Sequence, residues 1–157
     1  GAQLNQSLIE FLKTEKNVAV SPLMAAQIKD AIGQAYPTGD LRSMQIMGQD
    51  LLSGQFRQLD LSSTELIEGL HPPLYRIANF LRQTIRSLSP ELCADILESG
   101  VRLSGGTAQM PGIDDFFSEE LRIPVFVAEH PDLTTILGAG SLLDNEDLLD
   151  WLGEERD

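Results

Sequence analysis

Residues 101–113 read VRLSGGTAQMPGI, and ten residues later the segment 123–131 reads IPVFVAEHP. Each segment opens with a short apolar run, which is typical of a buried strand. The first run stops at Gly105 and Gly106, and residues 113–121 between the two runs have helical spacing. Strand, helix and strand in this order predict a βαβ unit with two parallel strands, and therefore an α/β fold.

The neighbouring segments extend this pattern on both sides. Residues 133–137 begin a further predicted helix. Upstream, apolar residues recur every three or four positions over 66–88, which predicts a long helix with one buried stripe. Pro72 and Pro73 lie inside this helix, and we expect them to break or kink it. A second, shorter helix is predicted over 89–100.

The first sixty residues show a mixed pattern of helices and strands. Helical spacing over 4–12 predicts an opening helix. The Ser-Pro pair at 21–22 predicts the start of a second helix, because serine caps helices and proline is favoured at the first helical position. Apolar runs at 44–47 and 56–61 predict two antiparallel strands, joined by a turn near 50–54.

Three parts follow from these elements. We expect residues 1–62 to form a smaller α+β subdomain with a short antiparallel sheet. Residues 63–143 then hold the long helix and the βαβ remainder of a larger subdomain. Residues 144–157 form an acidic tail, whose small apolar face consists of Leu148, Leu149, Trp151 and Leu152.

Composition excludes several classes of function. The 157 residues carry a net charge of −13, which argues against nucleic-acid partners because phosphate binding needs Lys and Arg. No apolar run approaches the roughly 20 residues of a membrane-spanning helix, so we expect no direct membrane insertion. Gly1–Gln6 have no secretory pattern, and Cys93 is the only cysteine. We therefore expect a soluble, cytoplasmic protein.

Two places could bind a ligand. The glycine turn at Gly105 and Gly106 permits close approach to backbone N–H groups before a helix, but it matches neither the dinucleotide nor the phosphate-loop motif. From the pattern alone, a plain strand-to-helix turn, in which glycine serves backbone geometry, is the favoured interpretation. Lys29, with Gln27 and Asp30, is the second place, and a solvated helix face is the simpler interpretation there.

The residue types that usually carry catalysis are sparse. His71, before two prolines, and His130 lack partners at the spacing of a metal site, so we expect both in turns or on the surface. No basic residue flanks Cys93 to favour a thiolate, which favours a buried structural role. We predict no catalytic residue and no metal site.

Five stretches together resemble the bacterial actins of the MreB and MamK type. The resemblance follows chain order and covers nearly the whole sequence. Its motifs in that family read AEEIK…IGSAYP, PPELAADI, a strand followed by TGGGA, GIPV-VAEDP and ALGAG. The corresponding residues here are 25–37, 89–96, 101–113, 123–131 and 137–140.

The resemblance implies part of an actin-like, ribonuclease H-like ATPase domain. It covers only the family's second domain, subdomains IIA and IIB, and omits both phosphate loops. The implied role is a subdomain of a cytoskeletal filament protein, serving cell shape or organelle positioning such as the magnetosome chain. Its expected partners are a second copy, the other half of the actin-like fold, or other proteins.

The resemblance also implies a remnant nucleotide site. Its residues here are Lys29, Gly105, Gly106, Thr107 and Met110, on the adenosine side of the cleft. Without phosphate and Mg²⁺ loops we expect no ATPase activity and no cofactor for this chain. The resemblance assigns ATP and Mg²⁺ to a full-length parent protein. Whether that parent is an ATPase stays an open alternative.

Two departures from the family pattern support an alternative. Ala26 replaces the glutamate of the family's Glu-x-x-Lys, and Thr107 replaces the third glycine, where a Cβ restricts φ. The alternative is a degenerate actin-like interaction module that no longer binds ATP. A sugar-kinase or chaperone fragment is a third hypothesis, which the 35–37 and 123–131 stretches disfavour. In every case we expect uncovered strand edges to self-associate or to be covered by rearrangement.

Overall fold

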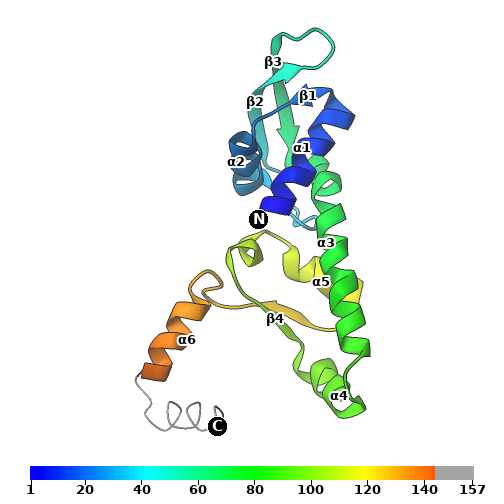
Figure 1. Cartoon of the computed structure of the whole chain (residues 1–157), viewed down its shortest axis with the longest axis vertical. Helices are drawn as coiled ribbons and strands as arrows, with labels where there is room; N and C mark the ends of the chain where they lie inside the picture. The colour runs from blue at the N-terminus through cyan, green and yellow to red at the C-terminus, as the bar shows by residue number, and fades with distance from the viewer. Residues whose placement is uncertain (144–157) are drawn as a thin grey trace, which may run out of the picture.

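A three-stranded antiparallel sheet lies at the upper end of the molecule in Figure 1. The computed structural model describes residues 1–143. Strands β2 (Ser43–Asp50) and β3 (Phe56–Ser62) pair antiparallel as predicted, with Met47 opposite Gln58. The sequence did not reveal β1 (Val18–Ala19), which pairs with the end of β2. Two residues are too few to show strand alternation.

Helices α1 (Ala2–Lys16) and α2 (Pro22–Ile32) form where the sequence predicts them. The Ser21 hydroxyl accepts a hydrogen bond from the Met24 N–H at 3.1 Å, and Pro22 occupies the first turn of α2. Each helix buries one apolar stripe. The buried residues are Leu4, Leu8 and Leu12 of α1, and Ala25, Ile28 and Ile32 of α2.

Helix α3 (Ser63–Arg86) is a continuous helix of 24 residues along the long axis. A capping box starts it: the Ser62 hydroxyl accepts from the Glu65 N–H, and the Glu65 carboxylate accepts from the Ser62 N–H. The predicted break at the prolines is wrong. Helix assignment continues through Pro72 and Pro73.

Packing against α1 explains why α3 continues. Proline at position 73 has no N–H to donate to the Gly69 carbonyl, and the Ser7 hydroxyl of α1 donates to that carbonyl instead, at 2.7 Å. Gly69 also lets α1 approach closely, because a Cβ there would lie 2.7 Å from the Phe11 ring. A tertiary contact thus replaces the helical hydrogen bond that Pro73 cannot form.

The lower end of the molecule contains the predicted βαβ unit. Strands β4 (Val101–Leu103) and β5 (Val125–Val127) pair in parallel, joined through α5 (Ile113–Leu121), so the predicted α/β class is confirmed. The helix predicted over 113–121 is α5, and a four-residue 3₁₀ turn, η1 (Gly106–Gln109), separates it from the glycine turn. Because β4 has one neighbouring strand, Val101 and Leu103 are half-buried rather than buried.

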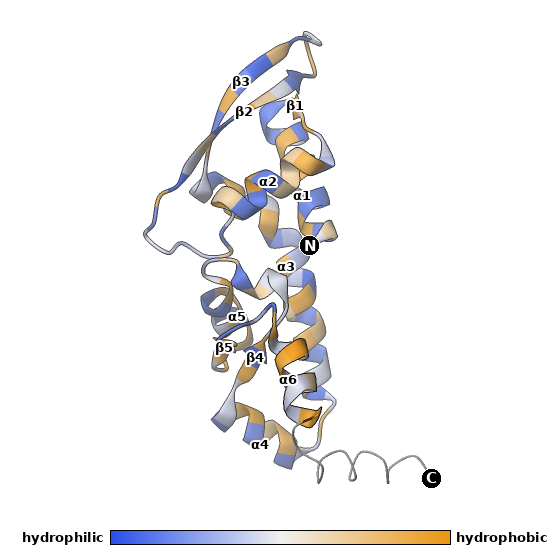
Figure 2. Ribbon diagram, turned by 90° about the vertical axis from the view of Figure 1, so that its left-hand side faces the viewer, coloured by the Kyte–Doolittle hydropathy of each residue, from blue (hydrophilic) through white to orange (hydrophobic). Residues whose placement is uncertain are grey.

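Two further helices flank this unit. Helix α4 (Pro90–Ser99) has Ser89 as its cap and ends at Gly100, as predicted. Helix α6 (Thr134–Leu143) extends away from the β4–β5 sheet (Figure 1) and is strongly apolar (Figure 2). The predicted acidic tail lies outside the described residues. The predicted subdomain boundary at residues 62 and 63 stays a prediction.

A three-way contact joins the loop after α2 to the lower part of the molecule. The Ala35 N–H donates to the Pro111 carbonyl at 2.8 Å, and the His71 Nε2 lies 3.1 Å from the Ala35 carbonyl. Gly112 has φ +72°, and a Cβ there would lie 2.7 Å from the Tyr36 carbonyl. His71 is therefore inside α3 and half-buried, and its predicted place in a turn is wrong.

Candidate functional site

Four of the five predicted ligand-binding residues line one cavity of about 200 Å³. Lys29 comes from α2, whereas Gly106, Thr107 and Met110 come from η1 and its end. The contact between Ala35 and Pro111 fixes these two segments against each other. The cavity also has Asp30, Gln109 and Pro111 in its wall. Gly105 immediately precedes the lining residues.

Lys29 is held at the wall of this cavity. Its side chain is only 17% exposed, and its ammonium forms an ion pair with the carboxylate of the adjacent Asp30. Asp30 is 68% exposed, so the pair faces solvent on one side. The predicted solvated helix face therefore holds for Asp30, while the stem of Lys29 is largely covered. The wall of the cavity therefore carries one ammonium group, from Lys29, and one carboxylate, from Asp30.

The glycine turn has one constrained and one unconstrained position. Gly105 has φ +89°, which side chains disfavour, and its N–H donates to the Pro131 carbonyl. At both Gly105 and Gly106, apart from neighbouring residues of the same turn, no atom of residues 1–143 lies within 4 Å of the place a Cβ would take. The space beside Gly106 is therefore open to a ligand, whereas Gly105 serves the backbone turn.

Thr107 fits its backbone without strain. The only non-glycine residues with positive φ in residues 1–143 are Asn17 and Arg122, so Thr107 keeps an ordinary φ. The backbone at this position therefore does not use the positive φ that glycine favours. Ala26 lies one turn before Lys29 on α2, and its methyl group offers neither charge nor hydrogen bond.

The cavity offers several polar groups and one apolar wall to a ligand. An ammonium, a carboxylate, the Gln109 amide and the Thr107 hydroxyl can each bond a polar ligand, and buried Met110 offers an apolar wall. Within residues 1–143, no three His, Cys, Asp or Glu side chains come together as metal ligands. Sequence reasoning missed Gln109 and Pro111, because only the pairing of Ala35 with Pro111 brings them to α2.

The remaining candidate residues lie elsewhere. His130 is exposed after β5, as predicted. Cys93 is half-buried on α4 rather than buried, and its thiol donates to the Ile85 carbonyl at 3.3 Å. Neither residue borders the cavity.

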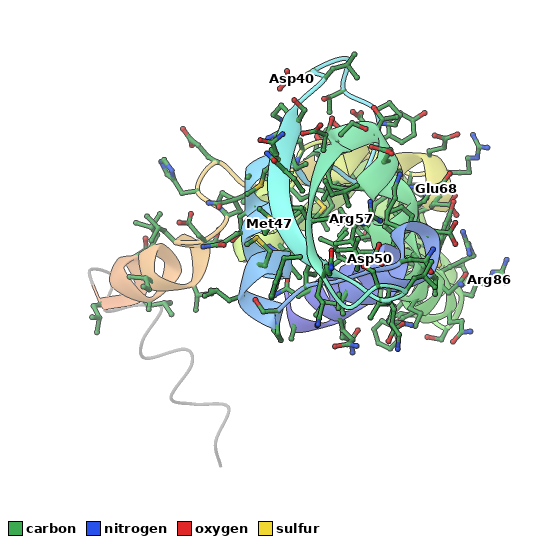
Figure 3. The ribbon with its side chains drawn as sticks, turned by 90° about the horizontal axis from the view of Figure 1, so that it is seen from above. Asp40, Met47, Asp50, Arg57, Glu68 and Arg86 are labelled. Carbon is green, nitrogen blue, oxygen red and sulfur yellow. The ribbon has the colours of Figure 1, made fainter. Side chains whose placement is uncertain are left out.

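Two carboxylates with lowered pKa values, Glu65 and Asp50, lie in the upper part of the fold. Hydrogen bonds from Lys16, at 2.5 Å, and from Ser62 lower the pKa of Glu65 to about 2. Hydrogen bonds from Ser53 lower the pKa of Asp50 at the tip of the β2–β3 hairpin. Figure 3 shows Asp50 beside Arg57, whose Nε lies 2.9 Å from the Asp50 Oδ2. These groups stabilise a helix start and a turn, away from the cavity.

Comparison with known proteins supplies the decisive observation. The model of the MreB/Mbl protein family matches residues 1–150. The chain belongs to the MreB/Mbl family. It is 32% identical over 149 residues to the cell shape-determining protein Mbl of Bacillus subtilis, covering 95% of this chain and 45% of that protein. It is 32% identical to the cell shape-determining protein MreB of Escherichia coli, covering 94% of this chain and 43% of that protein.

Solved structures show the same fold. The AMPPNP-bound MreB5 of Spiroplasma citri matches with a TM-score of 0.87 and 24% identity, over 98% of this chain and 45% of that one. The ADP-bound MreB5 of Spiroplasma citri matches with a TM-score of 0.85 and 26% identity, over 90% of this chain and 43% of that one. The MamK double helical filament matches with a TM-score of 0.69 and 18% identity, over 90% of this chain and 43% of that one. This MreB/Mbl chain thus spans less than half the length of these relatives.

The helices of the described residues were also compared with the requirements of a membrane span. None of the helices within residues 1–143 combines the length and apolar character needed to cross a bilayer.

Proposed function

We propose that this chain is the second-domain portion, subdomains IIA and IIB, of a bacterial actin-like filament protein that serves cell shape or organelle positioning. The single observation that carries the proposal is the cavity where Lys29 of α2 meets Gly106 and Thr107 of η1. Membership of a family whose curated relatives are cell shape-determining proteins supports the biological role.

The cavity would hold the adenosine part of a nucleotide. The open space beside Gly106 admits a ring, Met110 gives it an apolar wall, and Lys29 with Thr107 can bond its polar edges. Structural neighbours from Spiroplasma citri bind AMPPNP and ADP, which supports this assignment. The chain carries no phosphate-loop motif, so we propose that it has no ATPase activity of its own.

Self-association is the other part of the proposed function. MamK, a structural neighbour, forms double helical filaments, and head-to-tail contacts of one repeated kind produce open polymers. We propose that this chain supplies one filament face of a protein that acts in the cytoplasm. Self-association through the edges of the β4–β5 sheet stays a prediction.

Nuclear magnetic resonance would test the nucleotide assignment. In a titration of the ¹⁵N-labelled chain, adenosine and ATP should shift the amide signals of Gly106, Thr107 and Met110 to similar extents. Mg²⁺ should add nothing, because the chain contributes no phosphate-binding loop. Lys29→Ala should weaken the shifts, whereas the matched control Lys13→Ala, on the exposed part of α1, should leave them unchanged.

The second candidate function is an actin-like interaction module without nucleotide. Ala26 favours it, since no acidic group stands one turn before Lys29 to bond a ribose hydroxyl. Absence of any shift at Gly106 and Thr107 with millimolar adenosine and ATP would support this module and contradict the nucleotide assignment. Thr107, in place of the family's third glycine, favours this module as well.

A further inference from the structure

An apolar groove of about 440 Å³ lies at the lower end of the molecule, away from the Lys29 cavity. The C-terminal end of α3, helix α4 and the segment from α5 to β5 form its walls. Leu97 is 61% exposed, and helix α4 has no buried residue in the described structure. The apolar side chains of the groove are Ile85, Cys93, Ile96, Leu97, Leu121 and Ile123.

Positive charge gathers at the rim of this groove. Arg82, Arg86 and Arg122 line it, which is three of the eleven basic residues in a chain of net charge −13. Arg82 bonds the Glu120 carboxylate at 3.3 Å. Neither Arg86 nor Arg122 forms an ion pair with any residue of 1–143, and Arg86 projects outward from the fold (Figure 3). The groove therefore favours an apolar occupant that carries negative charge.

The sequence of residues 144–157, DNEDLLDWLGEERD, has that composition. It contains seven acidic residues against one arginine. Its apolar residues follow the spacing i, i+1, i+3 and i+4, which would place them on one side of a helix with carboxylates around them. They are Leu148, Leu149, Trp151 and Leu152.

We propose that residues 144–157 dock into this groove of the same chain. Their apolar side chains cover Ile85, Ile96 and Leu97, and their carboxylates face Arg86 and Arg122. This is the helix-in-groove mode of recognition, with charge setting the orientation. The proposal does not depend on nucleotide binding.

The geometry allows the segment to reach the groove. Helix α6 ends at Leu143, and Figures 1 and 2 both show that end of α6 and helix α4 at the lower end of the molecule. Fourteen extended residues span up to about 46 Å. A short tether gives an effective concentration of about a millimolar, so an affinity of about 0.1 mM would keep the segment docked about ten times more often than free.

Fluorescence of the full chain would test the proposal, because Trp151 is its only tryptophan. Docking should give Trp151 a blue-shifted emission and protection from acrylamide. Arg86→Glu should shift the emission to the red and increase quenching several-fold, and 0.5 M NaCl should act in the same direction. The matched control Arg76→Glu reverses an exposed arginine on the same helix outside the groove, and should change neither value.

Labelling of the single thiol gives an independent readout. Cys93 lines the groove, so Leu149→Asp should speed its reaction with a maleimide about tenfold relative to the unchanged chain. Circular dichroism would verify that each variant keeps its fold. An emission maximum of solvent-exposed tryptophan in the unchanged chain would overturn the proposal. Protection that rises with protein concentration would overturn it too, because it would assign the groove to a second copy.

Discussion

The upper and lower parts of the molecule differ in what supports their apolar surfaces. In residues 1–62, α1 and α2 each bury three apolar residues against the sheet and α3. In residues 87–143, neither α4 nor α6 has a buried residue, although both helices carry exposed Leu or Ile side chains. Helix α5 of the lower part does bury Ile113, Phe116 and Phe117, so the contrast concerns α4 and α6, whose apolar side chains the described chain leaves exposed.

The largest expected effect comes from the buried stripe of α1. Leu8 is fully buried, so Leu8→Ala should lower the free energy of unfolding by about 2–5 kcal/mol through lost burial and a residual cavity. Leu92→Ala on α4, where the side chain is 51% exposed, should change it by less than about 0.5 kcal/mol. Urea unfolding followed by circular dichroism measures both. Equal losses would contradict the contrast between the two parts.

Substitution of two glycines separates the stability contribution of the contact between the two parts from the cost of a positive φ. Gly112 and Gly54 both have φ +72°, but only at Gly112 would a Cβ meet another segment, 2.7 Å from the Tyr36 carbonyl. Gly54→Ala should cost about 1 kcal/mol through φ alone. Gly112→Ala should cost about 1–3 kcal/mol more through the clash. Similar midpoints in urea for the two variants would show that the segments separate easily.

The side-chain hydrogen bonds of two serines, one in each part, should differ in what they contribute to stability. Ser7 donates to the carbonyl that Pro73 leaves without a helical partner, and Ser99 on α4 donates to a carbonyl of its own exposed helix. Ser7→Ala should cost about 1–2 kcal/mol, because the carbonyl of buried Gly69 loses its side-chain donor. Ser99→Ala should be nearly neutral. Thermal unfolding measures the difference, and a neutral Ser7→Ala would refute the role given to this bond.

The smallest effect depends on pH. The pKa of Glu65 falls from 4.5 to about 2 in the folded chain, so its contribution is complete above pH 4.5 and disappears as the pH falls through 2. The side chain is 39% exposed and partly screened, so Glu65→Gln should cost only about 0.5–1 kcal/mol at pH 7. Urea midpoints at pH 7 and at pH 2 measure this loss. The exposed Glu68→Gln is the control, and a pH-independent loss would exclude the ionic origin.

Local patterns in the sequence predicted most of the fold. Helices α1, α2, α4 and α5 and the β2–β3 hairpin follow from spacing, caps and turn residues that lie within each element. The sequence could not reveal β1, because its partner lies thirty residues away in β2. It also misjudged Pro72 and Pro73, because the compensating hydroxyl comes from α1.

The candidate site was predictable only residue by residue. The resemblance singled out Lys29 and the glycine turn, but about 75 residues separate them in the sequence. Their meeting depends on the hydrogen bond between Ala35 and Pro111 and on the close approach at Gly112. The 3₁₀ turn that carries Thr107 was not predicted either, because four residues are too few to show a helical spacing.

The uninterrupted course of α3 has a mechanical consequence. At about 1.5 Å per residue, its 24 residues form a rod about 36 Å long that joins the hairpin end to the groove end. Bending stiffness along this rod is lowest at Pro72 and Pro73, where helical hydrogen bonds are missing. Ser7 and Phe11 support the rod at that point, so α1 sets how faithfully a rotation at one end of the molecule is transmitted to the other.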